Sequence, residues 1–377
     1  MKIGIITFHC ATNYGAVLQA IGLCDKLKEL GHETTIIDYR PAFITDRYNP
    51  YKVYRKSLKR MIYEVRAISY KVAINKQFDI FNAQYMETTE ETYYTNQEIH
   101  NTPPKFDIYI TGSDQVWNPQ LTGRKVDDAY YLGFASSGTK KISYAASFGS
   151  TKIDKCFWDD IASNIRNLDH VSVRESDGQD FIKEITGVEA AHVLDPVLLL
   201  DKFHWSKFAD ESESDGQPYI LIYALSPDDL LDEIARKVAN VLNLQVVSIA
   251  KPLTGINKYD QHIHSCGPGK FLELFKNATV VCTNSFHGTA FSIVFEKPFL
   301  VIPSSSRNER MDSLLKLLGL TSKKVSSVAQ LEGISIQDAL EYDLNNVSIL
   351  LNKERKKSLD FLQNNIYHNN KHGYKFN

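Results

Sequence analysis

A histidine stands where a predicted strand passes into a predicted helix. The apolar run 278–282 is followed by Thr283-Asn284-Ser285-Phe286-His287-Gly288 and then by a helix-like stretch from Ala290 to Phe295. Such a junction delivers side chains to the carboxyl edge of a parallel sheet, where α/β proteins bind ligands. An imidazole, with an ordinary pKa of about 6.5, donates and accepts protons near neutrality. His287 is thus the first candidate for acid–base catalysis; helix capping or loop anchoring is the alternative.

Polar residues follow four other predicted strands, which span 2–7, 106–111, 141–146 and 170–173. Parallel strands end at one edge of a sheet, so their end loops are expected to form one rim. The candidates to line a binding cleft there are Asn13, Tyr14, Gly15, Ser113, Asp114, Gln115, Trp117 and Ser147. Asn13 could equally cap the helix that follows it. The rings of Tyr14, Trp117 and Phe148 could stack on a sugar or serve only for packing.

Three arginines are candidates to hold an anionic substrate, because the planar guanidinium matches carboxylates and phosphates. Arg174 closes the strand 170–173, while Arg307 and Arg310 follow a strand bounded by prolines at 298 and 303. A surface ion pair is the alternative for each.

Three acids could accept a proton from a substrate hydroxyl, namely Asp114, Glu175 and Asp195. Acids at strand ends also cap helices or pair with arginine, which is the favoured interpretation of Asp195.

The elements that must position these residues alternate between strand and helix. After the first set of strands, a polar segment from Ser206 to Pro218 indicates a linker. The alternation then resumes with strands at 219–223, 245–249, 279–282 and 298–303 and helices at 228–242 and 271–277. This predicts an α/β protein of two doubly wound, Rossmann-like domains facing a cleft. We expect a first domain over 1–205, a second over 206–345 that carries His287, and a helical tail over 346–377 that packs back on the first.

Composition excludes several classes of protein. The 377 residues are 43% hydrophobic and 23% charged, with a formal net charge of −2, so no nucleic-acid partner is predicted. Five widely spread cysteines without a C-x-x-C pair indicate neither disulfides nor a zinc site and favour a reducing cytoplasm. No stretch approaches about 18 apolar residues, and no signal peptide is recognised. His262, His264 and Cys266 are interpreted as a polar loop, so no metal or cofactor is predicted.

A basic region from Lys52 to Lys76 is predicted to be helical and most simply forms a solvated face. It is also the candidate for peripheral membrane docking, should the substrate be lipid-linked.

Several motifs occur together in a fixed order. They are F-H-C-A-T-N-Y-G-A-V-L-Q (8–19), G-S-D-Q-V-W-N (112–118), Y-A-A-S-F-G (144–149), V-S-V-R-E (171–175), L-D-P-V (194–197) and N-S-F-H-G-T-A-F (284–291). Over residues 1 to 320 the chain closely resembles the polysaccharide pyruvyl transferase family. The resemblance implies a GT-B-like fold and transfer of the pyruvyl group of phosphoenolpyruvate to hydroxyls of a glycan or its lipid-linked precursor.

The resemblance also implies residue roles. His287 matches the family's catalytic acid, and Arg174 matches the arginine of its V-R-E motif. The expected donor-binding residues are Arg174, Asn284, Ser285, Gly288, Arg307 and Arg310. Characterised members can carry Arg-Leu-His where this chain has Ser285-Phe286-His287. Either another cation takes the place of that arginine, or the donor is a different one.

Two other functions stay open from the residues. A GT-B glycosyltransferase would use the helix after His287 and nearby cations to bind the diphosphate of a nucleotide sugar. A non-catalytic glycan-binding protein could have kept the same fold. The acceptor sugar, the ketal linkage and the oligomeric state are not predicted.

Overall fold

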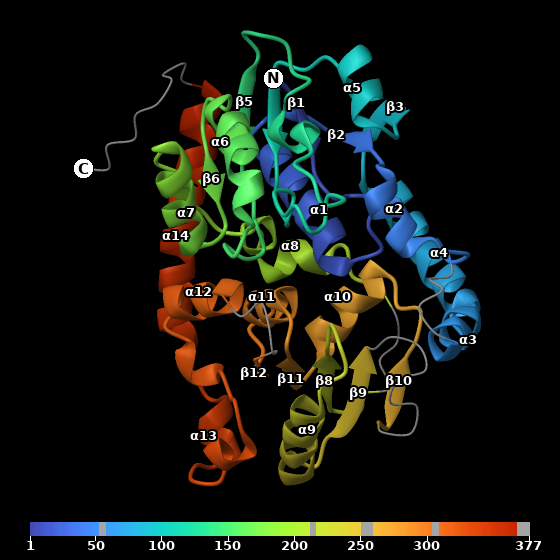
Figure 1. The fold of residues 1–377 in the computed structure, drawn as a ribbon. Helices are drawn as coiled ribbons and strands as arrows, with labels where there is room; N and C mark the ends of the chain where they lie inside the picture. Colours follow the sequence, from blue (N-terminus) through green and yellow to red (C-terminus); the bar gives the residue numbers. More distant parts are fainter. Residues whose placement is uncertain (53–57, 212–215, 250–258, 304–308, 368–377) are drawn as a thin grey trace. The chain divides into compact units, whose positions relative to one another are not determined.

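The computed structural model describes residues 1–52, 58–211, 216–249, 259–303 and 309–367, without the side chains of 58–60 (Figure 1). The chain divides into two compact units. Unit 1 comprises Met1–Tyr48, Ala83–Leu199 and Asn352–Asn377, and unit 2 comprises Asn49–Asn82 and Leu200–Leu351. Each unit contains a five-stranded sheet of parallel strands.

The sheet of unit 1 has the strand order β3-β2-β1-β4-β5. Its strands are β1 (Lys2–Ile6), β2 (Glu33–Tyr39), β3 (Thr88–Tyr93), β4 (Ile108–Thr111) and β5 (Lys140–Ser143). In the centre, Ile3 pairs with Thr34 on one side and with Ile108 on the other. The buried, continuous apolar runs of β1 and β4 suit strands covered on both faces. A short pair, β6 (Ser172–Val173) and β7 (Ala191–His192), extends this arrangement beyond β5 through parallel bridges such as Ile142 to His170.

The sheet of unit 2 has the order β10-β9-β8-β11-β12. Its strands are β8 (Tyr219–Tyr223), β9 (Gln245–Ile249), β10 (Gln261–Ile263), β11 (Val280–Thr283) and β12 (Phe299–Val301). The central strand β8 is buried throughout and pairs with β9 and β11. The carboxyl ends of β8 and β11 are therefore neighbours, and the loops that follow them meet at one edge.

Helices connect the strands in both units. Unit 1 contains α1 (Tyr14–Glu29), α2 (Ala42–Tyr48), α5 (Asn96–Asn101), α6 (Trp158–Arg166) and α7 (Ser176–Thr186). Unit 2 contains α3 (Leu58–Arg66), most of α4 (Ile68–Tyr85), α8 (Lys202–Ser206), α9 (Asp229–Leu242), α10 (Pro268–Asn277), α11 (Phe286–Val294), α12 (Glu309–Leu317) and α13 (Ile336–Leu340). Short 3-10 turns occur at Asp128–Tyr131, Lys155–Phe157, Pro196–Leu198, Thr321–Lys323 and Val328–Leu331. Among the described residues, no helix is both long and apolar enough to span a bilayer.

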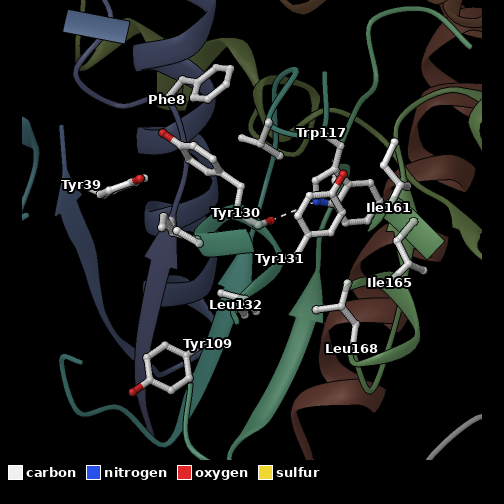
Figure 2. Packing of buried hydrophobic residues seen from close by; sticks show 14 of the residues in the cluster. Phe8, Tyr39, Tyr109, Trp117, Tyr130, Tyr131, Leu132, Ile161, Ile165 and Leu168 are labelled. Atoms are coloured by element: carbon white, nitrogen blue, oxygen red, sulfur yellow. Dashed lines mark hydrogen bonds between the residues drawn. The ribbon is translucent and has the colours of Figure 1, made fainter. Parts of the chain in front are cut away.

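Aromatic rings dominate the core of unit 1 (Figure 2). Trp117 stacks on Tyr131 with ring centroids 5.1 Å apart, and its indole Nε1 donates to the Tyr130 carbonyl at 3.0 Å. Tyr130 in turn meets Phe8 edge-on at 5.0 Å. This packing fixes the loop after β4 onto the loop after β1, which brings two of the predicted rim segments together.

The C-terminal helix α14 (Leu344–Tyr367) continues into unit 1 after Leu351. Within unit 1, its Arg355 Nε donates to the Leu198 carbonyl at 2.6 Å, and its Ser358 Oγ accepts from Leu194 N at 2.9 Å. Phe361 packs near Tyr144, with ring centroids 6.5 Å apart. The second half of α14 thus supports the segment that follows β7.

Several elements differ from the sequence prediction. Helix α11 begins at Phe286 rather than near Ala290, so His287 lies in its first turn. The stretch 251–269, expected as a loop, contains β10 within its described part. Residues 49–82 group with unit 2, although the sequence placed them in the first domain. The chain passes between units at Leu199 and Leu200, and residues 206–211 of the expected linker belong to unit 2; residues 212–215 lie outside the described part.

Candidate active site

Ser285 caps the helix that carries His287. Its Oγ accepts a hydrogen bond from Gly288 N at 3.4 Å, and its carbonyl accepts one from Thr289 Oγ1 at 3.0 Å. A serine at this position satisfies helix N–H groups that otherwise lack partners. The His287 side chain follows in the first turn, with 8% of the residue exposed. The structure therefore gives Ser285 a local role as the N-cap of α11.

Asn284 ties the loop after β11 to the loop after β8. Its Oδ1 accepts from Leu225 N at 3.0 Å, and its Nδ2 donates to the Ser226 carbonyl at 3.5 Å. One residue earlier, Thr283 Oγ1 donates to the Tyr223 carbonyl at 2.6 Å. The junction before His287 is thus held by side-chain bonds as well as by the sheet.

Gly288 lies where a side chain does not fit. A Cβ at this position would come 2.2 Å from Thr283 Oγ1 and 3.0 Å from the Tyr223 ring. The first turn of α11 therefore approaches the sheet closely because residue 288 has no side chain.

We expect Gly288→Ala to destabilise the protein by about 1–3 kcal/mol, since overpacking forces α11 away from β11. Alanine in place of a helical glycine ordinarily stabilises a protein by up to about 1 kcal/mol. The sign of the change in the free energy of unfolding therefore distinguishes a steric clash from this ordinary effect. Urea unfolding measures the difference. Gly333→Ala is the matched control in unit 2, because a Cβ there meets nothing within 4 Å; equal effects of the two substitutions would contradict the steric account.

Arg310 lies beside the same helix start. Its guanidinium carbon is 6.0 Å from the centroid of the Phe286 ring, and the His287 ring is 5.1 Å from that ring. Phe286 thus contacts both the imidazole and a buried cation. Arg307, the other arginine expected here, lies outside the described residues.

Arg174, in unit 1, is surrounded by three carboxylates. Its Nη1 donates to Asp195 Oδ2 at 2.6 Å and its Nε to Glu175 Oε1 at 3.0 Å, while Nη2 lies 4.0 Å from Asp114 Oδ1. Burial opposes the positive charge, but the carboxylates of Glu175, Asp195 and Asp114 outweigh this effect and raise the pKa of the guanidinium above its usual value. Arg174 therefore organises the loops after β4 and β6.

The three acids around Arg174 differ in what else they contact. Asp195 is buried; it accepts from Val197 N at 3.0 Å and from Ser113 Oγ at 3.2 Å. Glu175 accepts from Ser147 Oγ at 2.8 Å. Asp114, with a φ of +64°, has a side chain that is 14% exposed. Of these acids, Asp114 has the most accessible carboxylate.

The predicted cleft residues of unit 1 are mostly buried. Asn13 caps α1 by accepting from Ala16 N at 3.1 Å, and Tyr14 and Gly15 begin that helix. Ser113 and Ser147 are fully buried, and Gln115 is nearly so. Trp117 lies in the aromatic core with one face against Tyr131 (Figure 2). In this structure Trp117 packs, and the Ser113 and Ser147 hydroxyls support the Arg174 network.

A histidine–aspartate pair at the ends of β1 and β2 had not been predicted as a unit. His9 Nε2 lies 2.8 Å from Asp38 Oδ1, and Thr92 Oγ1 donates to Asp38 Oδ2 at 2.7 Å. Burial raises the pKa of Asp38, but the bonds from His9 and Thr92 outweigh it and lower this pKa to about 2. An aspartate directly after the apolar pair Ile36 and Ile37 in β2 was the available signal in the sequence.

We expect Asp38→Asn to cost about 1–2 kcal/mol of stability at pH 7. The pKa of Asp38 is lower in the folded than in the unfolded chain, so this stabilisation is present above about pH 4 and is lost as the pH falls toward 2. Urea unfolding between pH 7 and pH 2 should show wild type and variant converging. Asp180→Asn, an exposed position in α7, is the control; a gap that stays constant with pH would contradict the assignment.

The histidines near β10 form a ring cluster. The rings of His262 and His264 are 4.3 Å apart, and Tyr259 stacks on His262 at 5.7 Å. Over the described ranges, no group of three or more His, Cys, Asp or Glu side chains is placed to hold a metal ion.

Comparison with known proteins assigns the family. The family model for polysaccharide pyruvyl transferase matches residues 13–306. This chain belongs to the polysaccharide pyruvyl transferase family. The match includes Arg174, Asp114 and His287, while Arg310 lies just beyond it. No curated protein sequence matches the chain.

Solved structures show that this pyruvyl transferase family member has a GT-B-like fold. S. aureus MnaA, in a co-structure with UDP, has a TM-score of 0.56 at 12% identity over 97% of this chain and 96% of that one. A UDP-GlcNAc 2-epimerase from Neisseria meningitidis, bound to UDP-GlcNAc, has a TM-score of 0.52 at 10% identity over 96% and 100%. At these identities the likeness establishes the fold alone.

Proposed function

We propose that this family member transfers the pyruvyl group of phosphoenolpyruvate to hydroxyls of a cell-surface polysaccharide or its lipid-linked precursor, forming a pyruvate ketal. The observation that carries the proposal is the position of His287, in the first turn of a capped helix at the carboxyl edge of a parallel sheet, inside the family match. Ligands of α/β proteins bind at this edge.

His287 is the proposed acid. Protonation of the methylene carbon of phosphoenolpyruvate gives an oxocarbenium-like centre, which an acceptor hydroxyl attacks. Departure of phosphate and attack by a second hydroxyl then complete the ketal. The two hydroxyl protons offset the proton taken up by carbon and the one taken up by phosphate. Asp114, Glu175 and Asp195 in unit 1 are the candidates for the base that accepts a hydroxyl proton, and Asp114 has the most exposed side chain of the three.

Arg310 and the start of α11 are the proposed donor site. Phosphoenolpyruvate carries a phosphate and a carboxylate, which favour a guanidinium and helix N–H groups. Arg310 lies against Phe286 next to His287, so it can supply the cation that Ser285 does not. Asn284 and Gly288 would hold the geometry of this site, with Arg307 as a further candidate cation.

Ligand-induced stabilisation separates this function from a nucleotide-sugar enzyme. A ligand at 100 times its Kd raises the free energy of unfolding by about 2.7 kcal/mol. We expect phosphoenolpyruvate to raise the melting temperature and UDP to leave it unchanged. The two similar structures are complexes with UDP and UDP-GlcNAc, so stabilisation by UDP alone would favour the nucleotide-sugar reaction. Mass spectrometry of cell-surface glycan with and without the protein then tests for the ketal itself.

A further inference from the structure

Helix α3 and the first half of α4 expose apolar side chains and bury a carboxylate. Met61, Ile62, Val65 and Val72 are 37%, 46%, 55% and 39% exposed. The side chain of Glu64, between them, is only 2% exposed and pairs with Lys71. A surface helix of a protein surrounded by water has the opposite arrangement, with its apolar stripe turned inward.

The exposed apolar side chains lie along one side of α3 and α4. Val65 follows Met61 by four residues, and Val72 follows Val65 by seven, which is the repeat of an α-helical face. The backbone continues between the helices, because Ala67 N donates to the Tyr63 carbonyl and Lys71 N to the Ala67 carbonyl, both at 2.9 Å. Met61, Val65 and Val72 therefore form one apolar strip along α3 and the first part of α4.

The other side of α4 already has packing partners within unit 2. The Tyr70 ring lies 6.4 Å from His264, and Gln77 packs at Gly267. Phe78 is buried. The outward strip is therefore not the face by which these helices attach to the unit.

Basic residues accompany the strip. Arg66 and Lys76 are exposed, one helical turn after Ile62 and Val72 respectively. From residue 58 to residue 76 the sequence has five Lys and Arg residues and one acid, Glu64, in a chain whose formal net charge is −2. Lys71 pairs with that acid, so Arg66 and Lys76 are the exposed basic side chains described beside the strip.

We propose that this docking face, formed by Met61, Ile62, Val65, Arg66, Val72 and Lys76, holds the protein on an anionic lipid surface. Apolar side chains would enter the headgroup boundary while the basic ones meet lipid phosphates, as in other interfacial helices. A two-fold contact between copies of this chain would instead bring like charges together. The inference does not depend on the pyruvyl transfer reaction.

Vesicle flotation of the full-length protein tests the proposal. We expect binding to vesicles of equal parts phosphatidylcholine and phosphatidylglycerol, little binding to phosphatidylcholine alone, and release at about 1 M salt. Arg66→Glu with Lys76→Glu should lower the partition coefficient at least about 25-fold, at about fivefold for each positive charge removed. Ile62→Glu with Val65→Glu should abolish binding while leaving the melting temperature within a few degrees, because both positions are exposed.

Matched controls lie elsewhere on unit 2. Val241→Glu changes an exposed apolar residue of α9, and Lys316→Glu an exposed lysine of α12; neither should affect flotation. Failure to bind anionic vesicles, equal binding to neutral ones, or equal losses in the controls would overturn the proposal. A fall in solution mass with Val65→Glu, without a change in flotation, would make the face a contact between copies and would also overturn it.

Discussion

Replacing His287 by alanine is expected to lower glycan-dependent phosphate release from phosphoenolpyruvate by about 10²–10⁴-fold, the usual contribution of a general acid. The substitution removes the imidazole from the first turn of α11 and leaves the capping bond of Ser285 intact. Phosphate release at saturating donor, with the native glycan as acceptor, gives the rate. Circular dichroism and the melting temperature show that the variant is folded.

Two control variants show whether the loss of activity comes from the missing imidazole. His264→Ala removes an exposed histidine beyond β10 in the same unit and should keep nearly full activity. Ser285→Ala removes the cap, so it should cost about 1 kcal/mol of stability without removing the acid. Unchanged phosphate release from the His287→Ala protein would exclude His287 as the acid and, with it, the proposed reaction step.

Replacing Arg174 by methionine is expected to destabilise the protein by about 3–5 kcal/mol, because it leaves buried carboxylates without their cation. Asp195 and Glu175 both contact the guanidinium at hydrogen-bond distance, and the Arg174 side chain is 2% exposed. Urea unfolding at pH 7 measures the loss. A deficit below about 1 kcal/mol would show that the network contributes little.

The pH dependence and a double variant identify the cause of that loss. Protonation of the remaining acids relieves their repulsion, so the deficit of Arg174→Met should shrink as the pH falls. Asp195→Asn combined with Arg174→Met should be more stable at pH 7 than Arg174→Met alone, because one uncompensated charge is gone. A purely steric effect would leave the deficit independent of pH.

The fold could be predicted largely because parallel sheets place continuous apolar runs in the centre. The prediction for β8 matches Tyr219–Tyr223, and β9 likewise matches Gln245–Ile249. Strand β3 (Thr88–Tyr93) was missed because it is a polar edge strand, T-T-E-E-T-Y, without an apolar pattern. The start of α11 was placed too late because a glycine near a helix start resembles a turn, whereas the Ser285 cap allows the helix to begin at Phe286.

The candidate site was predictable in its residue types but not in its pairings. The strand-end motifs indicated His287, Arg174 and Asp114 as polar residues near sheet edges. Which acids surround Arg174 depends on loops that are distant in sequence, since Asp114 and Asp195 are 81 positions apart. The same applies to Trp117, whose ring stacks in the core because Tyr131 folds back onto it. Such contacts depend on tertiary packing, which short-range patterns do not encode.

The bonds from Asn284 to Leu225 and Ser226 have a consequence for the energetics of donor binding. They hold the segment before His287 in place through the protein's own groups. A ligand that docks at this helix start then loses little free energy in arranging the backbone, so more of its interaction energy appears as affinity. Replacing Asn284 would shift that ordering cost to the binding step. Weaker binding would then come with a more negative entropy of association, even though no group in contact with the ligand had changed.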